Sequence, residues 1–548
     1  MLFAITQYKQ ISVISAGWRF AGGVTSYNRY FERMQKPAFI SRKPTMYPSF
    51  RDFIAAMSVA LVLVPQSIAY AGLAGLPPAQ GLFAATLPLI AAAIFGSSPW
   101  LQTGPVAMTS ILTLGALSAL ADPYTADYVG MAALLALIVG VTRVLIGVVK
   151  AGHLVYLMSE PVLNGFTTAA ALVILTTQAS AFFGVETAGG NVFSPLLTVF
   201  SQPQLWSVPG LIMGVAALIV IILGKRLHVL FPAVLVAVAA AIALQSVYNC
   251  ECKTIGAFPA EFPTLSFLLP WHRFDELLIP GVMIALVGFA EPSAIARTLA
   301  ASSRRPWSAS KEFLGQGAAN ITAGVIGAFP VGGSFSRTMI SYSAGATSRW
   351  SGALTGIIVL ALLPLANLMS VLPQSVLAAI ITSAVYPLIK FGPMIQLIRT
   401  SRAQAMVAWA TFVLTLLLSP RIDLALLLGM GTGVVVHLWR EMRINVSHSY
   451  TDHTLWLEPV GVLFFGSAQG LDETLLDELA KHPEAEELIL DLRRLGRIDY
   501  TGALVIHRIA LEAEQAGLNV SVIPGQPPQG ELLLKRVFGD DSIHILKT

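Results

Sequence analysis

Two short stretches combine glycine, proline and small polar residues within otherwise apolar sequence. The first, from residue 102, reads Gln-Thr-Gly-Pro-Val-Ala-Met, and the second, from residue 329, reads Phe-Pro-Val-Gly-Gly-Ser-Phe-Ser-Arg. Because glycine and proline interrupt helices, each stretch predicts a helix that begins in the middle of an apolar region. The N-terminus of such a helix presents free N–H groups and the positive end of the helix dipole, which favour an anion.

Hydroxyl and cationic side chains surround the second of these breaks. Ser334, Ser336 and Thr338 supply hydroxyl donors, and Arg337 supplies a fixed positive charge. Two interrupted helices at matching positions predict an anion site at membrane depth. The alternative is that glycine and proline only permit close packing or a kink. We favour the site because the break recurs in both halves of the chain.

The first apolar run carries polar groups that also fit a binding role. Gln66 and Tyr70 lie four residues apart and therefore share one face of a helix. A polar side chain at membrane depth is costly unless it meets a partner or a substrate. Hydrogen bonding between helices is the alternative to substrate binding.

Glu291 is the acidic residue that lies well inside a predicted membrane segment. A low dielectric favours the neutral form of a carboxyl group, so Glu291 is a candidate for taking up a proton near physiological pH. The alternative is a structural ion pair with Arg297 or Arg337.

Composition indicates the elements that position these residues. The chain has 548 residues, of which 55% are hydrophobic and 12% charged, and its mean hydropathy is +0.70. Soluble domains carry roughly 25% charged residues, so this is a membrane composition. Runs long enough to cross a bilayer, together with several short or interrupted ones, predict about fourteen segments. These are residues 53–73, 82–97, 105–121, 129–149, 160–183, 207–224 and 229–247, followed by 279–299, 311–328, 335–346, 350–369, 371–389, 403–419 and 422–439. Seven plus seven segments place the two halves in opposite orientations, as in an inverted repeat.

Loop charges indicate the orientation in the membrane. Basic residues follow the even-numbered segments, whereas the loops after odd-numbered segments are neutral, acidic or mixed. The basic set includes Arg143, Lys150, His153, Lys225, Arg226, Arg304, Arg305, Lys311, Lys390, Arg399, Arg402, Arg440 and Arg443, and the acidic set includes Asp122, Asp127 and Glu186. The positive-inside rule then places both termini in the cytoplasm. We expect a basic cytoplasmic arm over residues 1–48, or from Met34 if that is the true start, a membrane domain over 49–444 and a cytoplasmic domain over 445–548.

The last of these domains has a mixed α/β pattern. Glu487-Leu-Ile-Leu-Asp-Leu predicts a buried strand, and the run from Ile498 to Ile506 predicts the start of a helix. Asp499 and Thr501 suit the turn and the helix start.

Composition and motifs also exclude other classes. The formal charge of +4 comes from basic residues that flank apolar runs, so a nucleic-acid partner is not expected. An assembled pattern of nucleophile, base and metal is missing from the sequence, and we expect no enzyme activity, cofactor or metal. Cys250 and Cys252 fit an inert or disulfide-linked loop pair better than a redox or metal site.

Four stretches resemble the sulfate permease (SulP) family. They are Val64-Pro-Gln-Ser-Ile-Ala-Tyr-Ala-Gly-Leu-Ala-Gly-Leu-Pro-Pro-Ala-Gln-Gly-Leu-Phe-Ala, Thr103-Gly-Pro-Val-Ala-Met-Thr-Ser, Ser159-Glu-Pro-Val-Leu-Asn-Gly-Phe and Gly332-Gly-Ser-Phe-Ser-Arg-Thr. The resemblance implies a fourteen-segment inverted repeat in which segments 1–4 and 8–11 form a core that moves against a gate. It also implies a homodimer in the cell membrane. The anion would lie between the third and tenth segments, near Gln66, Tyr70, Val106, Ser336 and Arg337.

The resemblance also bears on substrate and coupling. Sulfate carried by proton symport is our main expectation, and bicarbonate, chloride or dicarboxylate carriers, exchangers, channels and motor-like members are the alternatives. Sodium-linked bicarbonate carriers of the family have a second acid four residues after the glutamate, where this chain has Ile295. That difference favours proton coupling through Glu291. The C-terminal domain resembles the STAS domain, in whose soluble relatives the position of Thr501 is phosphorylated; a helix cap and docking surface is the alternative role.

Overall fold

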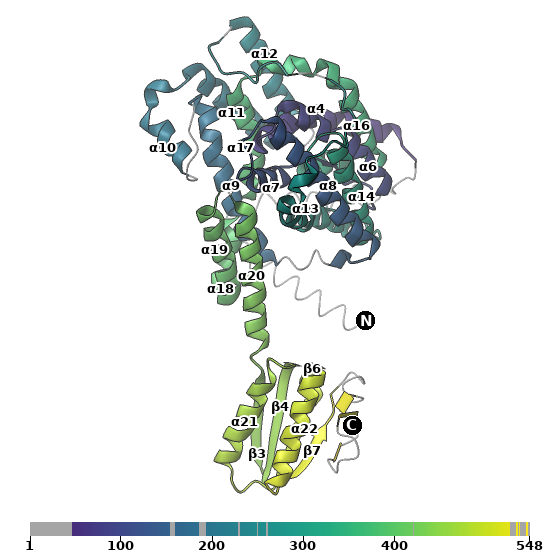
Figure 1. Ribbon diagram of the computed structural model, residues 1–548, viewed down its shortest axis with the longest axis vertical. Coiled ribbons are helices and arrows are strands. Elements are labelled where there is room, and N and C mark those ends of the chain that lie inside the picture. Colours follow the sequence, from purple (N-terminus) through teal and green to yellow (C-terminus); the bar gives the residue numbers. More distant parts are fainter. Residues whose placement is uncertain are drawn as a thin grey trace. The chain divides into compact units, whose positions relative to one another are not determined.

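The computed structural model describes residues 47–153, 159–185, 193–227, 231–248, 250–258, 261–419 and 421–525, together with 533, 534, 536, 537, 544 and 545. The expected basic arm, with Met34, lies almost wholly outside the described residues, as does Glu186. Contacts between residues divide the chain into two compact units, and the boundary in the sequence falls between Gly431 and Thr432. The first unit is helical, and the second contains a sheet with helices (Figure 1).

Helices make up nearly all of the first unit. In the first half of the chain they are α4 (Phe50–Leu73), α5 (Pro78–Ala84), α6 (Leu87–Phe95), α7 (Ala107–Leu117), α8 (Ala126–Val148), α9 (Glu160–Phe183), α10 (Ser194–Ser201), α11 (Val208–Leu227) and α12 (Ala233–Tyr248). In the second half they are α13 (Phe274–Ser302), α14 (Ala309–Val325), α15 (Phe335–Ser343), α16 (Trp350–Leu362), α17 (Gln374–Val385), α18 (Phe391–Thr400), α19 (Arg402–Leu417) and α20 (Ile422–Glu441). Short 3-10 turns are η3 (Pro203–Leu205), η4 (Trp271–Arg273), η5 (Leu363–Val371) and η6 (Tyr386–Leu388).

Within the described residues, eight helical segments are long and apolar enough to cross a membrane. A helix lies in each of the fourteen ranges expected from the sequence, but several of these helices are short. The number of crossings and the seven-plus-seven repeat therefore remain predictions. Two short helices, α10 and α18, were not expected from the apolar runs.

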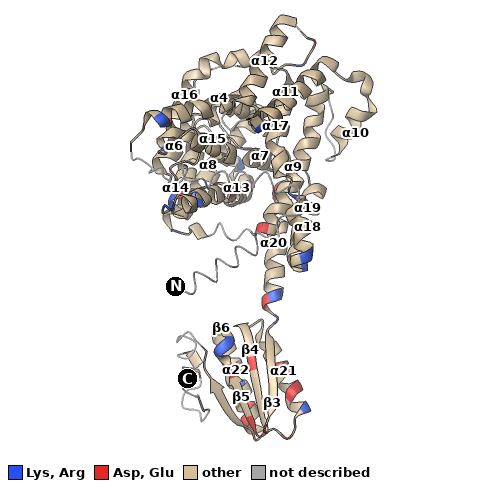
Figure 2. Cartoon of the chain, turned by 180° about the vertical axis from the view of Figure 1, so that it is seen from behind, with Lys and Arg blue, Asp and Glu red and all other residues tan. Residues whose placement is uncertain are grey.

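One residue of the expected loop charges lies elsewhere. Arg143 is inside α8, and its side chain is fully buried at 0% exposure. Our interpretation of Arg143 as a loop charge is therefore wrong. Lys150, which lies just after the end of α8, is exposed as expected. Charged residues are sparse over the helical unit and more frequent in the second unit (Figure 2).

The start of α4 shows why the chain becomes helical at the first apolar run. Ser49 accepts a hydrogen bond from the Asp52 N–H, and the Asp52 carboxylate accepts one from the Ser49 N–H, which is a capping box. The same carboxylate also accepts hydrogen bonds from Thr347 and Ser348. Asp52 thus ties the start of α4 to the segment between α15 and α16.

A two-residue strand marks the helix break in each half of the chain. Strand β1 (Thr103–Gly104) pairs antiparallel with β2 (Gly332–Gly333), so that Thr103 faces Gly333 and Gly104 faces Gly332. Helix α7 begins shortly after β1, and α15 begins shortly after β2. These two paired strands, called the β1–β2 crossing, therefore bring together the starts of two helices from opposite halves of the chain.

The second unit is built on a sheet whose strands are mainly parallel. Its strands are β3 (Asn445–Thr451), β4 (Thr454–Leu463), β5 (Glu487–Asp491), β6 (Leu495–Ile498), β7 (Asn519–Ile523) and β8 (His544–Ile545), and its helices are α21 (Ala468–Lys481), α22 (Tyr500–Gln515) and the turn η7 (Leu492–Arg494). The strand order is β3-β4-β5-β7-β8, with β6 also paired to β4, and only β3 and β4 are antiparallel.

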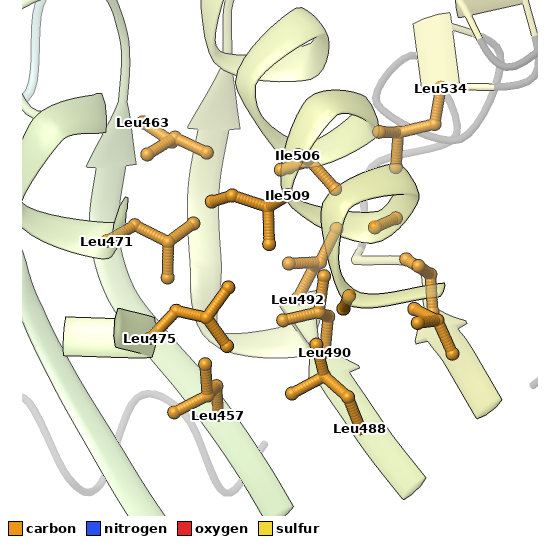
Figure 3. Packing of buried hydrophobic residues seen from close by; sticks show 14 of the residues in the cluster. Leu457, Leu463, Leu471, Leu475, Leu488, Leu490, Leu492, Ile506, Ile509 and Leu534 are labelled. Atoms are coloured by element: carbon orange, nitrogen blue, oxygen red, sulfur yellow. The ribbon is translucent and has the colours of Figure 1, made fainter. Parts of the chain in front are cut away.

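Leucine and isoleucine side chains fill the space between this sheet and its helices. Leu471 and Leu475 of α21 and Ile506 of α22 meet Leu457 and Leu488 from the strands (Figure 3). The expected strand at Glu487 and the expected helix start near Asp499 are both confirmed as β5 and α22. The Asp499 carboxylate accepts a hydrogen bond of 2.7 Å from the Gly502 N–H, and Thr501 is exposed.

Candidate functional site

The β1–β2 crossing directs two helix N-termini toward one region. Val106 and Ser334 are the residues before α7 and α15; both are extended, and neither makes a side-chain cap. The first N–H groups of each helix therefore receive no capping oxygen from these residues. Because the paired strands run in opposite directions, the two helices approach the crossing from opposite sides. Their dipoles add to a positive potential there.

Arg337 supplies the strongest feature of the site. Its side chain is 0% exposed, and its Nε, Nη1 and Nη2 atoms all lack a hydrogen-bond partner among the residues that the structure describes. A buried guanidinium without partners is costly, because the hydration of its charge and its hydrogen bonds to water are both lost. An anion bound at the crossing would satisfy these donors through paired, charge-assisted hydrogen bonds.

The backbone at Gly104 makes room for this guanidinium. Gly104 has φ of 149°, and a Cβ added there would lie 3.4 Å from Arg337 Nη2 and 3.3 Å from Leu89 Cδ1. A side chain at this position would combine a disfavoured backbone conformation with contact against the guanidinium. The glycine of β1 thus allows the backbone to approach Arg337 closely.

Helix α4 places Gln66 and Tyr70 beside the crossing. Both side chains are buried, and Gln66 Oε1 has no hydrogen-bond partner. Tyr70, Glu291 and Arg337 interact electrostatically with one another, which places the three groups close together. The structure therefore brings Gln66, Tyr70 and Arg337 into the same region. In the sequence they are candidates from two separate segments.

Glu291 lies on α13 and faces the start of α15. Its carboxylate accepts a hydrogen bond from the Phe335 N–H, and its side chain is partly exposed. The guanidinium of Arg337 makes no hydrogen bond to Glu291, but the two groups interact electrostatically. The alternative of an ion pair with Arg297 or Arg337 therefore stays open.

The serine and threonine residues around the second break do different jobs. Ser334 is buried and its hydroxyl lies 3.4 Å from that of Ser336, which is exposed. Thr338 Oγ1 instead accepts a hydrogen bond of 3.0 Å from the Gln102 N–H. The Thr338 oxygen therefore helps to hold the crossing, and the role of its O–H as a donor to the anion stays a prediction.

Sequence reasoning missed the amides that hold the crossing in place. Gln102 Nε2 donates to the hydroxyls of Ser341 and Ser351, each at 3.0 Å, and Gln316 Nε2 donates to Thr103 Oγ1 at 2.7 Å. The available signal was the presence of Gln316 and Asn320 inside a predicted membrane segment, where amides are costly unless they are paired.

The loop cysteines form no cross-link. Cys250 and Cys252 are free thiols, and burial together with the nearby Cys250 raises the pKa of the Cys252 thiol. In the described part of the chain, His, Cys, Asp and Glu side chains form no cluster of three or more suited to a metal ion.

Long apolar helices, two short helices meeting at a two-stranded crossing, and a separate α/β domain define a polytopic helical membrane transporter fold. Residues 50–411 match the model of the sulfate permease family, and residues 445–548 match that of the STAS domain. The chain belongs to the sulfate permease family and carries a C-terminal STAS domain.

Relatives and solved structures agree with this assignment. The chain is 32% identical over 419 residues to "Sulfate transporter 4.1, chloroplastic" from Arabidopsis thaliana, a match that covers 72% of this chain and 61% of the relative. It is 31% identical over 407 residues to a probable sulfate transporter from Mycobacterium tuberculosis, covering 73% and 70%. The chain thus spans less than two thirds of the plant relative.

Two solved structures show the same fold. Murine Solute Carrier 26 family member A9 in the inward-facing state has a TM-score of 0.83 at 19% identity, covering 97% of this chain and 94% of that one. The transmembrane domain of the cyanobacterium bicarbonate transporter BicA has a TM-score of 0.61 at 20% identity, covering 72% and 99%.

Proposed function

We propose that this chain is a secondary active transporter of sulfate or a similar inorganic oxyanion. The observation that supports the proposal best is the fully buried Arg337, whose three guanidinium nitrogens lack partners where the α7 and α15 N-termini meet. A tetrahedral oxyanion offers several acceptor oxygens to one guanidinium fork and to free backbone N–H groups. Relatives named as sulfate transporters support sulfate as the first anion to test.

The proposed anion ligands are Arg337, the hydroxyls of Ser334 and Ser336, and the α7 N-terminus at Val106. Gln66 and Tyr70 of α4, both buried, are the further proposed ligands. These ligands combine fixed positive charge with few acceptors, so the site selects anions over cations.

We propose that Glu291 couples a proton to the anion. Glu291 is close enough to interact electrostatically with Arg337, and it faces the first N–H of α15, so its charge acts on the region proposed for the anion. A bound anion opposes the ionised carboxylate and favours its protonation. By linkage, protonation must then strengthen anion binding by the same factor. Symport follows when both ions cross together.

We further propose that the site moves as one body, in an elevator-like step. The proposed ligands and Glu291 lie on α4, α7, α13 and α15, which all belong to the segments assigned to the core by resemblance. None of them lies on α9 to α12 or α17 to α20. Movement of the core against these helices would carry the intact site between the two membrane faces, with the termini in the cytoplasm.

Transport in reconstituted vesicles tests this function. Purified protein in proteoliposomes should take up radiolabelled sulfate with saturation, and an inward proton gradient should drive accumulation above the external concentration. Uptake that rises linearly with concentration and follows only the membrane potential would indicate an anion channel. Saturable uptake of bicarbonate or chloride, with none of sulfate, would support a carrier mechanism but exclude sulfate as the substrate.

A further inference from the structure

Arg143 is a second fully buried arginine, and it has a different environment from Arg337. Its Nε donates to the Ala285 carbonyl at 3.0 Å, Nη2 to the Ile284 carbonyl at 3.2 Å and Nη1 to the Val331 carbonyl at 3.0 Å. These acceptors belong to α13 and to the residue before β2. Among the described residues no carboxylate forms a salt bridge with Arg143. One side chain of α8 thus joins α8, α13 and the strand that leads into α15.

The burial of a cation against neutral carbonyls alone costs free energy, because no negative charge offsets the lost hydration. A leucine or methionine would fill the same space in an apolar helix without that cost. The three carbonyls match the fixed fork of a guanidinium, whereas a lysine ammonium has a single nitrogen. The residue type therefore fits a connector that holds three backbone segments in one geometry.

Val331 is held from two sides. Arg143 binds its carbonyl, and the Asn320 side chain of α14 both donates to that carbonyl at 3.0 Å and accepts from the Val331 N–H at 2.9 Å. The next two residues form β2, and α15 starts directly after them. The position of Val331 consequently determines where the α15 N-terminus points.

The same guanidinium holds α13 near Glu291. Ile284 precedes Glu291 by seven residues, about 10 Å along a helix axis at roughly 1.5 Å per residue, and on the same face. Gly288 lies between them, and Pro292, the residue after Glu291, leaves the Gly288 carbonyl without its helical donor. A Cβ added to Gly332 would lie 3.5 Å from that carbonyl, so β2 lies against α13 at Gly288.

We propose that Arg143 is a positioning residue of the transport site, which fixes β2 and the start of α15 relative to Glu291. This inference rests on the proposed anion site, and it assigns Arg143 no contact with the anion. Its specific consequence is that small displacements of the guanidinium weaken anion binding, even when the charge at position 143 is kept.

Gly288 offers a mild way to displace this guanidinium. A Cβ on Gly288 would lie 2.7 Å from Arg143 Nη2 and 3.2 Å from Thr109 Cγ2 of α7, so Gly288→Ala displaces the guanidinium most and Thr109 less, while keeping all charges and favouring the helix. Gly392→Ala is the matched control, because a Cβ on this glycine of α18 meets nothing within 4 Å. Arg143→Lys is the second variant, since it keeps the charge but loses the fork.

Two readouts on the purified full chain are needed. Sulfate affinity is measured from the sulfate-dependent rise in Tm, and backbone hydrogen–deuterium exchange is measured over residues 331–336 without sulfate. We expect Gly288→Ala and Arg143→Lys to bind sulfate roughly threefold to tenfold more weakly, the range for one weakened hydrogen bond or two. Exchange over residues 331–336 should rise in both, and Gly392→Ala should match the wild type in both readouts.

The outcomes separate the inference from the proposed function. Wild-type affinity in both variants would overturn the positioning role, as would reduced affinity with unchanged exchange over residues 331–336. Faster exchange with unchanged affinity would show a structural role only and would also overturn it. If the wild type itself gives no response to sulfate, the proposed substrate fails, and exchange over residues 331–336 alone decides whether Arg143 fixes this segment.

Discussion

Removing the guanidinium of Arg337 should separate anion binding from folding. In Arg337→Met the side chain keeps most of its apolar stem but loses the three buried guanidinium nitrogens, which have no hydrogen-bond partner in the described part of the chain. If these donors serve the anion, the loss of even one charge-assisted hydrogen bond costs about 1.5–3 kcal/mol, and affinity falls at least about tenfold to hundredfold. Arg337→Lys should recover part of this, because it restores the charge without the fork.

Stability should change in the opposite direction. The wild type buries an uncompensated charge at 0% exposure, and replacement of such a charge by an apolar side chain of similar size is often neutral or stabilising. We therefore expect the Tm of anion-free Arg337→Met to equal or exceed that of the wild type. At saturating sulfate the order should reverse, because only the wild type gains the binding free energy.

The assay is thermal unfolding of detergent-purified protein over a series of sulfate concentrations. Arg399→Ala is the matched control, since Arg399 is an exposed arginine on α18. The reasoning would be refuted by a folded Arg337→Met protein with wild-type sulfate affinity. A large fall in the anion-free Tm would also refute it, because that result would mean that Arg337 has a structural partner.

Four further predictions concern coupling, orientation and the C-terminal domain. Glu291→Gln mimics the protonated carboxyl, so sulfate exchange should persist while acceleration by an inward proton gradient is lost; intact gradient-driven accumulation would exclude Glu291 as the coupling group. An impermeant thiol reagent should fail to label Arg304→Cys in intact cells when Cys250 and Cys252 are both replaced, because basic loops stay in the cytoplasm; labelling would invert the proposed orientation. Truncation after about Asn445 should lower transport or assembly but keep sulfate binding, since every proposed ligand lies upstream; complete loss of binding in a folded truncation would contradict this. A hydrogen bond from Lys481 lowers the pKa of Glu478, so its stabilisation exists above the unfolded carboxyl pKa of about 4.3 and is lost as pH falls through the lower folded value; Glu478→Gln should reduce the stability of the STAS domain at pH 7 but not at pH 2, and equal losses at both pH values would disprove the ionic origin.

The helix breaks could be predicted from the sequence, whereas the way they meet could not. Glycine and proline at residues 104 and 105 and at 330–333 are local signals, and α7 and α15 start where they predict. The pairing of Thr103 with Gly333 joins segments far apart in the chain, and two-residue strands carry no periodic pattern. The site geometry depends on that pairing, so the sequence indicated the ligands better than their arrangement.

Arg143 and Thr338 show which contacts could not be predicted from the sequence. Arg143 precedes a basic loop, and its real partners are backbone carbonyls, which leave no complementary residue type in the sequence. Thr338 lies in the expected motif, and its hydroxyl oxygen also accepts a hydrogen bond from the Gln102 N–H, a backbone contact that the sequence did not indicate. The backbone carbonyls that Arg143 contacts and the backbone N–H that Thr338 contacts can be identified only once the segments are packed together.

The position of the bound anion is the most direct test of this account. Selenate has the shape and charge of sulfate, and selenium scatters X-rays anomalously, so a crystal of the full chain with selenate locates the anion without interpretation of weak density. We predict one dominant anomalous peak at the β1–β2 crossing, between the N-termini of α7 and α15 and within hydrogen-bond distance of the Arg337 guanidinium. A dominant peak elsewhere, or none at the crossing under conditions where binding is saturated in solution, would contradict the proposed site.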